Sequence, residues 1–575
     1  MAESAVALIS APPRRRAWRV SFQDPLLYVQ AFAILLLLVL ILYPAGILLN
    51  LSIRDGGGAF SLLWYIQAYS TPRNYEAILN TLVIGAGAAV LASLAGTFLA
   101  WAIVRTDMPG RRLMEMASVV PFISTPFLGA LAWILLGSPE TGLVNQFWRY
   151  LGGTGSLIHI YSIEGIIFVI ALYEMPFVFL MVSGALRSMD PSLEEASLSS
   201  GAGLFATTVK VTLPLVLPAI LASSLLVFVL AAEQFAVPAV LGSPARIRVL
   251  TTAIVETQYR YPPQHGLGAA LCMTLLLIAL AGLWVQRRLL RGRSYTTVAG
   301  KSAHPHRVAL GPFRWVVLAV CVAYLTLAVV LPFLTLFLSS VRTFWTAEFE
   351  WSQLTLEHYR WILFDYPITQ RAIFNSLLLG VVGATVTMLL CAVLSFLTLR
   401  TRLPGRKLLD YLTIVPLGFP GVVLAFGLLQ AWIHPPLVLY GTIWILFIAY
   451  ITRYLPIGVR STSATLVQIH PELEEASISC GANWLQTLKN VTLPLLKPGI
   501  LAGWALLFVA FTRELSASIL LYSPGREVLS VAIYDLHQNG AFRPLSALAF
   551  LQIAISLVML GLAKWLVRLD RETGT

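Results

Sequence analysis

The sequence predicts an all-α polytopic membrane protein made of two tandem six-helix halves. Three observations predict it: the composition, a series of long uncharged runs and an internal repeat. Of the 575 residues, 58% are hydrophobic and only 11% are charged, and the mean hydropathy is +0.80. A soluble protein carries roughly 25% charged residues. At ~20 apolar residues per spanning helix, the chain can supply roughly a dozen spans, which excludes disorder and a purely soluble fold.

Twelve uncharged or nearly uncharged runs follow one another along the chain. Glu174 and Glu233 interrupt the fourth and fifth, and the charge-free stretch Tyr411–Thr452 is split at His434-Pro435-Pro436 because it is too long for one span. The first six runs are Leu26–Ile53, Ala77–Val104, Met116–Pro139, Gly165–Leu186, Ala219–Gly242 and Gly266–Gln286. The second six are Trp315–Val341, Ala372–Leu399, the two parts of Tyr411–Thr452, Gly499–Tyr522 and Pro544–Ala563.

The distribution of basic residues predicts how these spans are oriented. A net charge of +12 in a soluble chain would indicate nucleic-acid binding, but in a membrane protein Lys and Arg gather in cytoplasmic loops. Most of the 39 Lys and Arg residues fall in one set of alternate loops. We therefore expect a lipid bilayer around the chain, no nucleic-acid partner, and both termini in the cytoplasm.

The expected organisation follows the runs. A cytoplasmic N-terminus (1–25) precedes the first half (26–290), and a basic cytoplasmic linker (291–314) leads to the second half (315–567) and a cytoplasmic tail (568–575).

An internal repeat relates the two halves. Asn80-Thr81-Leu82, Arg105 and Pro109-Gly110-Arg111 recur 295 residues later as Asn375-Ser376-Leu377, Arg400 and Pro404-Gly405-Arg406. The segments Leu193–Ser197, Gly201-Ala202 and Val211–Leu215 recur 280 residues later as Leu473–Ser477, Gly481-Ala482 and Val491–Leu495. Six spans is an even number, so both copies share one orientation. We expect a pseudo-twofold axis along the membrane normal, with a pathway between the halves.

The best-matched polar segment of each copy lies in the cytoplasmic loop between its fourth and fifth spans, 188–218 and 468–498. In the first copy, Asp190-Pro191 can cap a short helix, and Glu194 and Glu195 fall in its first turn, where the helix dipole favours anions. His470 takes the place of Asp190 in the second copy.

The rest of this loop is expected to form an elbow. Gly201 ends the short helix, and a second amphipathic stretch from Leu204 to Val211 leads to Leu213-Pro214. We expect two short helices on an elbow in each copy. A pair of such loops presented in the cytoplasm suits docking to a dimeric partner.

At these residues the sequence resembles a known family. The patterns Glu195-Ala196-Ser197-x3-Gly201-x9-Val211-x-Leu213-Pro214 and Glu475-Ala476-Ser477-x3-Gly481-x9-Val491-x-Leu493-Pro494 resemble the Glu-Ala-Ala loop of permease subunits of bacterial ATP-binding-cassette importers. Ser stands in both copies where the family prefers Ala. The resemblance covers essentially the whole chain and implies two type I importer permease halves in the bacterial inner membrane.

In that family the loop docks on the ATPase and transmits its closure. The resemblance therefore implies a homodimer of separate ATPase subunits that hold ATP and Mg²⁺, an extracytoplasmic substrate-binding protein, and no catalytic residue or cofactor on this chain. It assigns ATPase coupling to Glu194, Glu195, Ala196, Gly201, Leu213 and Pro214, and to Glu474, Glu475, Ala476, Gly481, Leu493 and Pro494.

Two further segments narrow the resemblance. Arg513–Leu521 with Ser523-Pro524-Gly525, and Glu233-x4-Pro238-x2-Leu241-Gly242, resemble the iron(III) importer permeases. Ferric iron is therefore the expected substrate. Relatives that import thiamine, polyamines or phosphonates keep those substrates open as alternatives.

Five ionisable residues in or near the spans are candidates for the substrate pathway: Glu174, Glu233, Arg453, Arg513 and Glu514. Charged side chains cost a few kcal/mol each in lipid, so they should face the interior or one another. They either line or gate the pathway, or they form ion pairs that hold the halves together. If they line the pathway, Glu233 and Glu514 are expected near the central axis in the outer half of the membrane. If they form ion pairs, Glu514 is neutralised by an arginine such as Arg453.

Other classes of function are less well supported. An ion-driven secondary transporter can also be built from repeats, but it has no reason to repeat a cytoplasmic docking loop. A membrane enzyme would need a cluster of metal ligands or a nucleophile with its base. His304-Pro305-His306 lies in the linker, and Gly300-Lys301-Ser302 is not a phosphate-binding loop because Tyr295 stands where its first glycine would be.

Overall fold

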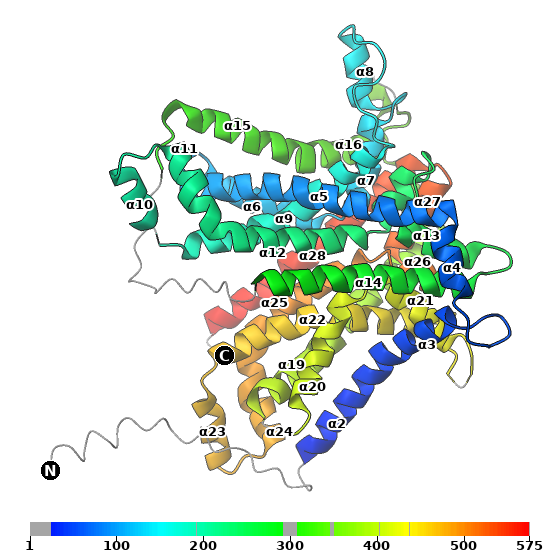
Figure 1. The fold of residues 1–575 in the computed structure, drawn as a ribbon, viewed down its shortest axis with the longest axis vertical. Helices are drawn as coiled ribbons and strands as arrows, with labels where there is room; N and C mark the ends of the chain where they lie inside the picture. Colours follow the sequence, from blue (N-terminus) through cyan, green and yellow to red (C-terminus); the bar gives the residue numbers. More distant parts are fainter. Residues whose placement is uncertain are drawn as a thin grey trace.

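The computed structural model describes residues 25–190, 192–290, 308–345, 350–401, 403–435 and 437–573 (Figure 1). Within these ranges the chain folds into helices without a β-strand, as the sequence predicts. Ten of the described helices are long and apolar enough to cross a membrane, and two bent helix pairs raise the number to 12 if each counts as one span. The N-terminal segment before Pro25, Pro191 and the linker residues 291–307 lie outside the described residues.

The long helices recur in the same order in the two halves. In the first half they are α2–η1–α3 (Pro25–Ser52), α5 (Pro72–Arg105), α9 (Ile163–Ser188), α11–η2–α12 (Leu204–Ala232) and α14 (His265–Leu290). In the second half they are η4–α15–η5–α16 (Gly311–Ser340), α18–η8–α19 (Pro367–Arg400), α22 (Ile443–Gln468), α24–η10–α25 (Trp484–Thr512) and α28 (Phe542–Thr573). The second, third and fourth of these match in length, at 34, 26 and 29 residues in both halves. The predicted fold class, two copies of one helical unit, is therefore confirmed.

The third span of each half is bent, which corrects the straight span expected over Met116–Pro139. Helix α6 (Arg111–Ile123) meets α7 (Pro126–Gly137) at 97°, and α20–η9 (Arg406–Gly418) meets α21 (Gly421–Trp432) at 108°. Ser124 ends α6 in extended conformation, and the side chain of Thr125 caps α7. Pro126 then starts the new helix, where a missing N–H costs nothing. The break between Gly418 and Gly421 was likewise not expected, because an apolar run does not reveal a bend.

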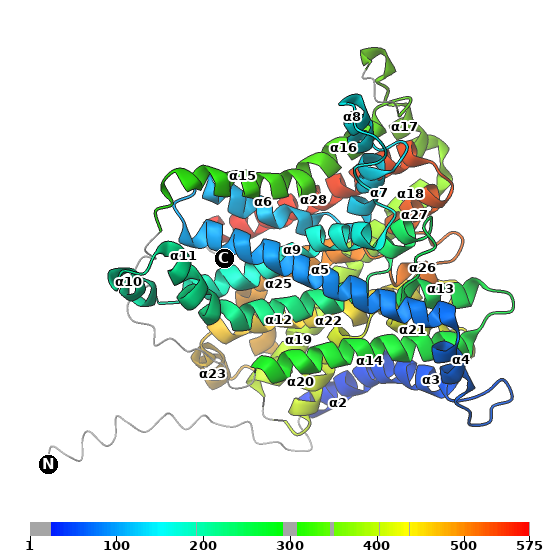
Figure 2. The same cartoon turned by 45° about the horizontal axis from the view of Figure 1, so that its top comes forward.

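The first helix of each half packs against the other half. Helix α2 (Pro25–Leu37) contacts α20 (Arg406–Ile414), and α3 (Tyr43–Ser52) contacts α21. In the same way α15 (Arg314–Leu325) contacts α6, and α16 (Leu331–Ser340) contacts α7. Both views show α2 and α3 along one side of the bundle and α15 along the opposite side (Figures 1 and 2). The two halves are therefore interlocked through their bent helix pairs.

The fifth span of each half begins earlier and ends earlier than expected. Leu204–Ala232 and Trp484–Thr512 are continuous 29-residue helices, so the predicted loops 188–218 and 468–498 end at residues 203 and 483. Pro214 has no N–H to donate to the preceding turn, yet it does not break the helix. The π-turn η2 (Thr208–Thr212), which lies just before it, accommodates the proline. The turn η10 (Leu488–Thr492) does the same before Pro494. Each loop therefore contains one short helix rather than the predicted two.

Candidate functional site

The two predicted docking loops lie at the same end of the bundle. Helices α10 (Ser192–Ser199) and α23 (Pro471–Ser479) both project from this end, opposite α13 (Leu250–Tyr259) and α27 (Leu529–Gln538) (Figure 1). The expected difference between their caps is confirmed. The Asp190 carboxylate accepts a hydrogen bond from the Ser192 N–H at 3.0 Å, which lowers the pKa of Asp190, whereas the side chain of His470 makes no capping bond.

A glycine ends the short helix in both loops, as predicted. Gly201 and Gly481 have φ of +84° and +91°, a left-handed conformation that costs glycine nothing. The N–H of Gly201 bonds to the Leu198 carbonyl, and the N–H of Ala202 bonds to the Ser197 carbonyl. This pattern caps the helix and turns the chain into α11 (Leu204–Thr207).

The first glutamate of each loop is buried. Glu194 is 6% exposed, its Oε2 lies 3.4 Å from Nη1 of Arg105, and its Oε1 accepts a hydrogen bond from the Thr212 hydroxyl at 2.5 Å. Glu474 repeats both contacts, 3.1 Å from Nε of Arg400 and 3.0 Å from the Thr492 hydroxyl. Neither carboxylate presents its charge to a partner. They instead fasten the short helix to the preceding long helix and to the helix that follows.

The serine of each Glu-Ala-Ser motif forms a further hydrogen bond that holds the short helix in place. The Ser197 hydroxyl lies 2.9 Å from the Thr207 hydroxyl, and the Ser477 hydroxyl lies 3.1 Å from that of Thr487. An alanine at these positions could not make this bond. The departure from the family pattern thus ties α10 to α11, and α23 to α24 (Trp484–Thr487).

The outward face of each loop is formed by the other predicted residues. Glu195, Ala196, Glu475 and Ala476 are exposed. Beside them lie matched, exposed apolar side chains, in the first loop Leu193, Leu198 and Phe205 and in the second Leu473, Ile478 and Leu485. Phe205 is 82% exposed. Leu213-Pro214 and Leu493-Pro494 are not part of this face, because they lie within the long helices.

The five predicted ionisable residues line one cavity between the two halves. This central cavity has a volume of about 460 Å³ and lies where α12 (Leu213–Ala232) and α25 (Leu493–Thr512) end, far from α10 and α23. Glu174 comes from α9, Glu233 directly follows α12, Arg453 comes from α22, and Arg513 and Glu514 directly follow α25.

Arg453 joins carboxylates from both halves. Its Nη2 lies 3.4 Å from Oε1 of Glu233, and its Nε lies 3.5 Å from Oε2 of Glu514. The Tyr454 hydroxyl donates to the same oxygen of Glu514, and the other oxygen accepts from the Ala517 N–H at 2.8 Å. The structure therefore brings Glu233 and Glu514 together, as expected, and also shows the expected pairing of Glu514 with Arg453.

The remaining two charges face different partners. The Nη1 of Arg513 donates to the Phe122 carbonyl at 2.7 Å, and its guanidinium lies 5.2 Å from the centre of the Phe122 ring. This carbonyl is free because α6 breaks just beyond Phe122. Glu174 is 7% exposed and its Oε1 lies 3.4 Å from the Gln234 amide nitrogen. Arg513 thus fastens the second half to the broken helix pair of the first.

A glycine makes room for the Arg453 guanidinium. A Cβ at Gly421, the first residue of α21, would lie 1.1 Å from Nη1 of Arg453. Any larger residue there must displace the arginine, so the bend in the second half shapes the charged cluster directly.

Tyr454, Gln234 and Gly421 also belong to this cluster and were not expected from the sequence. The repeat carried a signal for the first two, because the 280-residue offset relates Glu174 to Tyr454 and Gln234 to Glu514. It also relates Glu233 to Arg513. No signal identified Gly421, since its importance depends on the bend. Among the described residues, no group of three or more His, Cys, Asp or Glu is placed to hold a metal ion.

Comparisons with known proteins agree with this architecture. The family described as "Binding-protein-dependent transport system inner membrane component" matches residues 88–295 and 389–569. The ferric transport system permease protein FbpB of Actinobacillus pleuropneumoniae is 27% identical over 544 residues, covering 93% of this chain and 77% of that protein. A putative ferric transport system permease, FbpB 1 of Haemophilus influenzae, is 28% identical and covers 87% of this chain and 78% of its own length.

A shorter relative matches only one half of the chain. The putative 2-aminoethylphosphonate transport system permease protein PhnV of Salmonella choleraesuis is 31% identical over 241 residues, which is 41% of this chain and 89% of that protein.

Adjacent glutamates in the first loop are expected to respond differently to substitution. Glu194→Ala leaves the Arg105 guanidinium buried without its carboxylate, and removing one partner of a buried ion pair costs about 3–5 kcal/mol. We expect a lower melting temperature and less folded protein in the membrane. Glu195→Ala is the matched control and should melt like the wild type. Thermal unfolding of the purified variants measures both, and equal melting temperatures would contradict the fastening role of Glu194.

Substitution of Gly421 is expected to disrupt the charged cluster. In Gly421→Ala the new methyl group displaces Arg453 from Glu233 and Glu514, leaving buried charges without their partner. We expect the melting temperature to fall. Gly184→Ala on α9 is the control, because nothing lies within 4 Å of a Cβ at that position. The idea fails if the two alanine variants unfold at the same temperature.

Proposed function

Because this chain belongs to the binding-protein-dependent transport system inner membrane component family, we propose that it forms the complete transmembrane pathway of an importer for ferric iron. ATP is hydrolysed on two copies of a separate ATPase subunit, with ATP and Mg²⁺ bound there. The observation that carries the proposal is the pair of equivalent loops on one chain. Both termini and both loops then lie in the cytoplasm, and the opposite end faces outward from the inner membrane.

The outward faces of α10 and α23 support ATPase docking. Each combines a fastened short helix with an exposed Glu-Ala pair and three exposed apolar side chains at matched positions. Exposed apolar groups rimmed by polar ones are typical of a protein interface. A secondary transporter driven by ions would have no use for two such surfaces.

A substrate-binding protein is the proposed source of the solute. Dependence on such a protein is the property for which the family is described. It would dock at the end opposite α10 and α23, where α13 and α27 form the mouth of the path. The charged residues around Arg453 lie between that mouth and the loop end, so we propose that they line or gate the path.

The choice of ferric iron rests on the relatives that span the chain. Both ferric permeases named above match across the two halves, whereas the phosphonate permease matches only one. Carboxylate oxygens such as those of Glu233 and Glu514 suit a hard metal ion. An importer for phosphonates is the second candidate, and thiamine and polyamines are the further alternatives.

Uptake by whole cells tests the substrate and the path together. Cells that produce the complete importer should accumulate radioactive iron and not 2-aminoethylphosphonate. Glu233→Gln and Glu514→Gln should each lower iron uptake about tenfold at equal amounts in the membrane, since a contact to a charged group contributes ~1.5–3 kcal/mol. The exposed Glu140→Gln should transport normally. Unchanged uptake in both buried variants would remove these residues from the path without affecting the family assignment.

Native mass spectrometry tests the ATPase stoichiometry. We expect two copies of one ATPase subunit per chain in mild detergent, because the loops offer near-equivalent surfaces. Combining Glu195→Ala with Glu475→Ala should reduce co-purification of the ATPase while leaving the permease folded. A complex with a single ATPase copy would contradict the proposal.

A further inference from the structure

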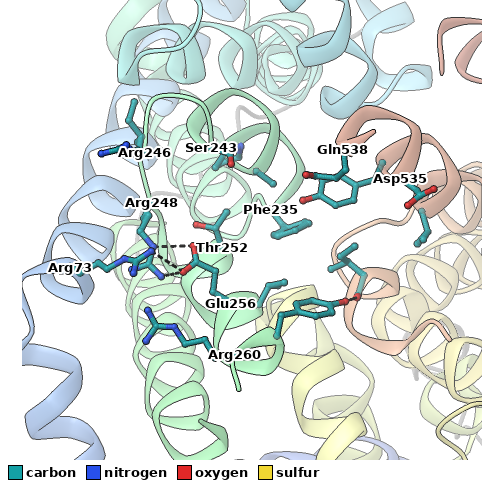
Figure 3. A pocket seen from close by; sticks show the side chains of 18 of the residues that line it. Arg73, Phe235, Ser243, Arg246, Arg248, Thr252, Glu256, Arg260, Asp535 and Gln538 are labelled. Atoms are coloured by element: carbon teal, nitrogen blue, oxygen red, sulfur yellow. Dashed lines mark hydrogen bonds and ion pairs between the residues drawn. The ribbon is translucent and has the colours of Figure 1, made fainter. Parts of the chain in front are cut away.

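A second, larger cavity opens at the end of the molecule opposite α10 and α23. This outer cavity has a volume of about 860 Å³ and lies between α13 of the first half and α27 of the second (Figure 3). Phe235 lines it, while Gln234 and Ala236 line the central cavity, so this short segment separates the two. A solute that reaches the charged cluster from this end passes through the outer cavity first.

One side of the outer cavity is strongly basic. Arg73, Arg246, Arg248 and Arg260 all belong to the first half, and we refer to them as the basic rim. Figure 3 shows all four on one side of the cavity and Asp535 and Gln538 on the other. Three carboxylates line the same cavity, Glu76, Glu256 and Asp535, against the four guanidinium groups of the rim.

The carboxylates do not neutralise the rim. Glu256 binds Arg248 through both oxygens, and its Oε2 also lies 3.5 Å from Nη2 of Arg73. Arg246 and Arg260 are exposed and form no ion pair with any residue that the structure describes. The buried Nη1 of Arg248 also has no hydrogen-bond partner. The exposed guanidinium groups of Arg246 and Arg260 are thus available for an external anion.

Arg246 occupies a strained backbone position. Its φ is +57°, and it is the only non-glycine residue with positive φ in the described part of the chain. A left-handed conformation is unfavourable for a residue with a Cβ. In the matching turn of the second half, Ser523–Arg526, the positive φ lies one position earlier, at Gly525, and Arg526, the counterpart of Arg246, has none. Keeping an arginine where glycine would be more stable indicates that its side chain has a use.

We propose that the basic rim binds an oxyanion, a carboxylate or phosphate group carried by the solute, before the solute enters the path between the halves. Planar guanidinium groups match the geometry of both oxyanions and bind them through paired hydrogen bonds. The inference rests on the proposed function for its direction of transport. Four arginines against three carboxylates leave the mouth with a net positive charge, which would repel a bare ferric ion, so iron reaches it as an anionic chelate.

The full-length chain in nanodiscs of zwitterionic lipid is suitable for a direct test. Citrate and inorganic phosphate serve as iron-free probes in isothermal titration calorimetry. The wild type should bind at least one of them saturably, with affinity that falls as salt is raised. Arg260→Gln should bind about tenfold more weakly with an unchanged melting temperature.

The variant Arg246→Gly tests whether the arginine is kept for binding or whether its strained backbone is only tolerated. We expect it to bind the probe about tenfold more weakly and to melt at a higher temperature, because glycine relieves the backbone strain. Arg526→Gln is the matched control. Arg526 closes the equivalent turn of the second half and is not among the residues that line the cavity, so its loss should change neither quantity.

Two results would overturn the proposal: absence of saturable binding by the wild type, or an Arg246→Gly variant that gains stability and keeps full affinity. The test is independent of the transport assay. Oxyanion binding that follows the arginines in a protein that imports no iron would refute the proposed substrate and leave the rim in place. Iron uptake without oxyanion binding would refute the role of the basic rim and leave the proposed substrate in place.

Discussion

This structure depends on one constraint: every charged side chain inside the apolar helix bundle must have a partner. An ionised side chain in lipid is costly unless it meets an opposite charge or a backbone group, and removing one partner of a buried pair is costlier still. Arg453 satisfies this condition for Glu233 of one half and Glu514 of the other. Arg513 satisfies it by reaching the Phe122 carbonyl, which the break after α6 leaves free. The two halves are therefore held at their centre by polar contacts that neither half can complete alone.

The two halves are alike at their loops and differ near the central axis. The triads Arg105–Glu194–Thr212 and Arg400–Glu474–Thr492 contain the same residue types in the same roles, although Arg105 approaches its glutamate through Nη1 and Arg400 through Nε. Near the axis the 280-residue offset relates Glu233 to Arg513, so an acid in one half takes the position that a base takes in the other. Two identical carboxylates approaching a twofold axis would repel each other. A fused chain can avoid this by giving each half a different residue, which two copies of one polypeptide could not do.

Much of the fold could be predicted because its signals are local or repeated. Long uncharged runs gave the spans, and the 280-residue offset gave the two loops with their capping glycines. The bends after Phe122 and Gly418 were missed because bent and straight helices have the same apolar composition. The continuity of the helix through Pro214 was missed because proline normally ends a helix, and only the preceding π-turn shows how it is accommodated. The burial of Glu194 next to exposed Glu195 could have been anticipated, since Arg105 recurs with it as Arg400.

The continuity through Pro214 also determines how the two ends of the molecule communicate. Glu194 fastens α10 to Thr212, which lies inside the helix Leu204–Ala232. At 1.5 Å per residue this helix is about 43 Å long, and Glu233 follows directly at its far end. The helix Trp484–Thr512 joins the second loop to Arg513 and Glu514 in the same way. If ATPase closure moves α10 and α23 together, two rigid helices carry that movement to the residues around Arg453. The elbow that the sequence predicts within the loop 188–218 would have absorbed it.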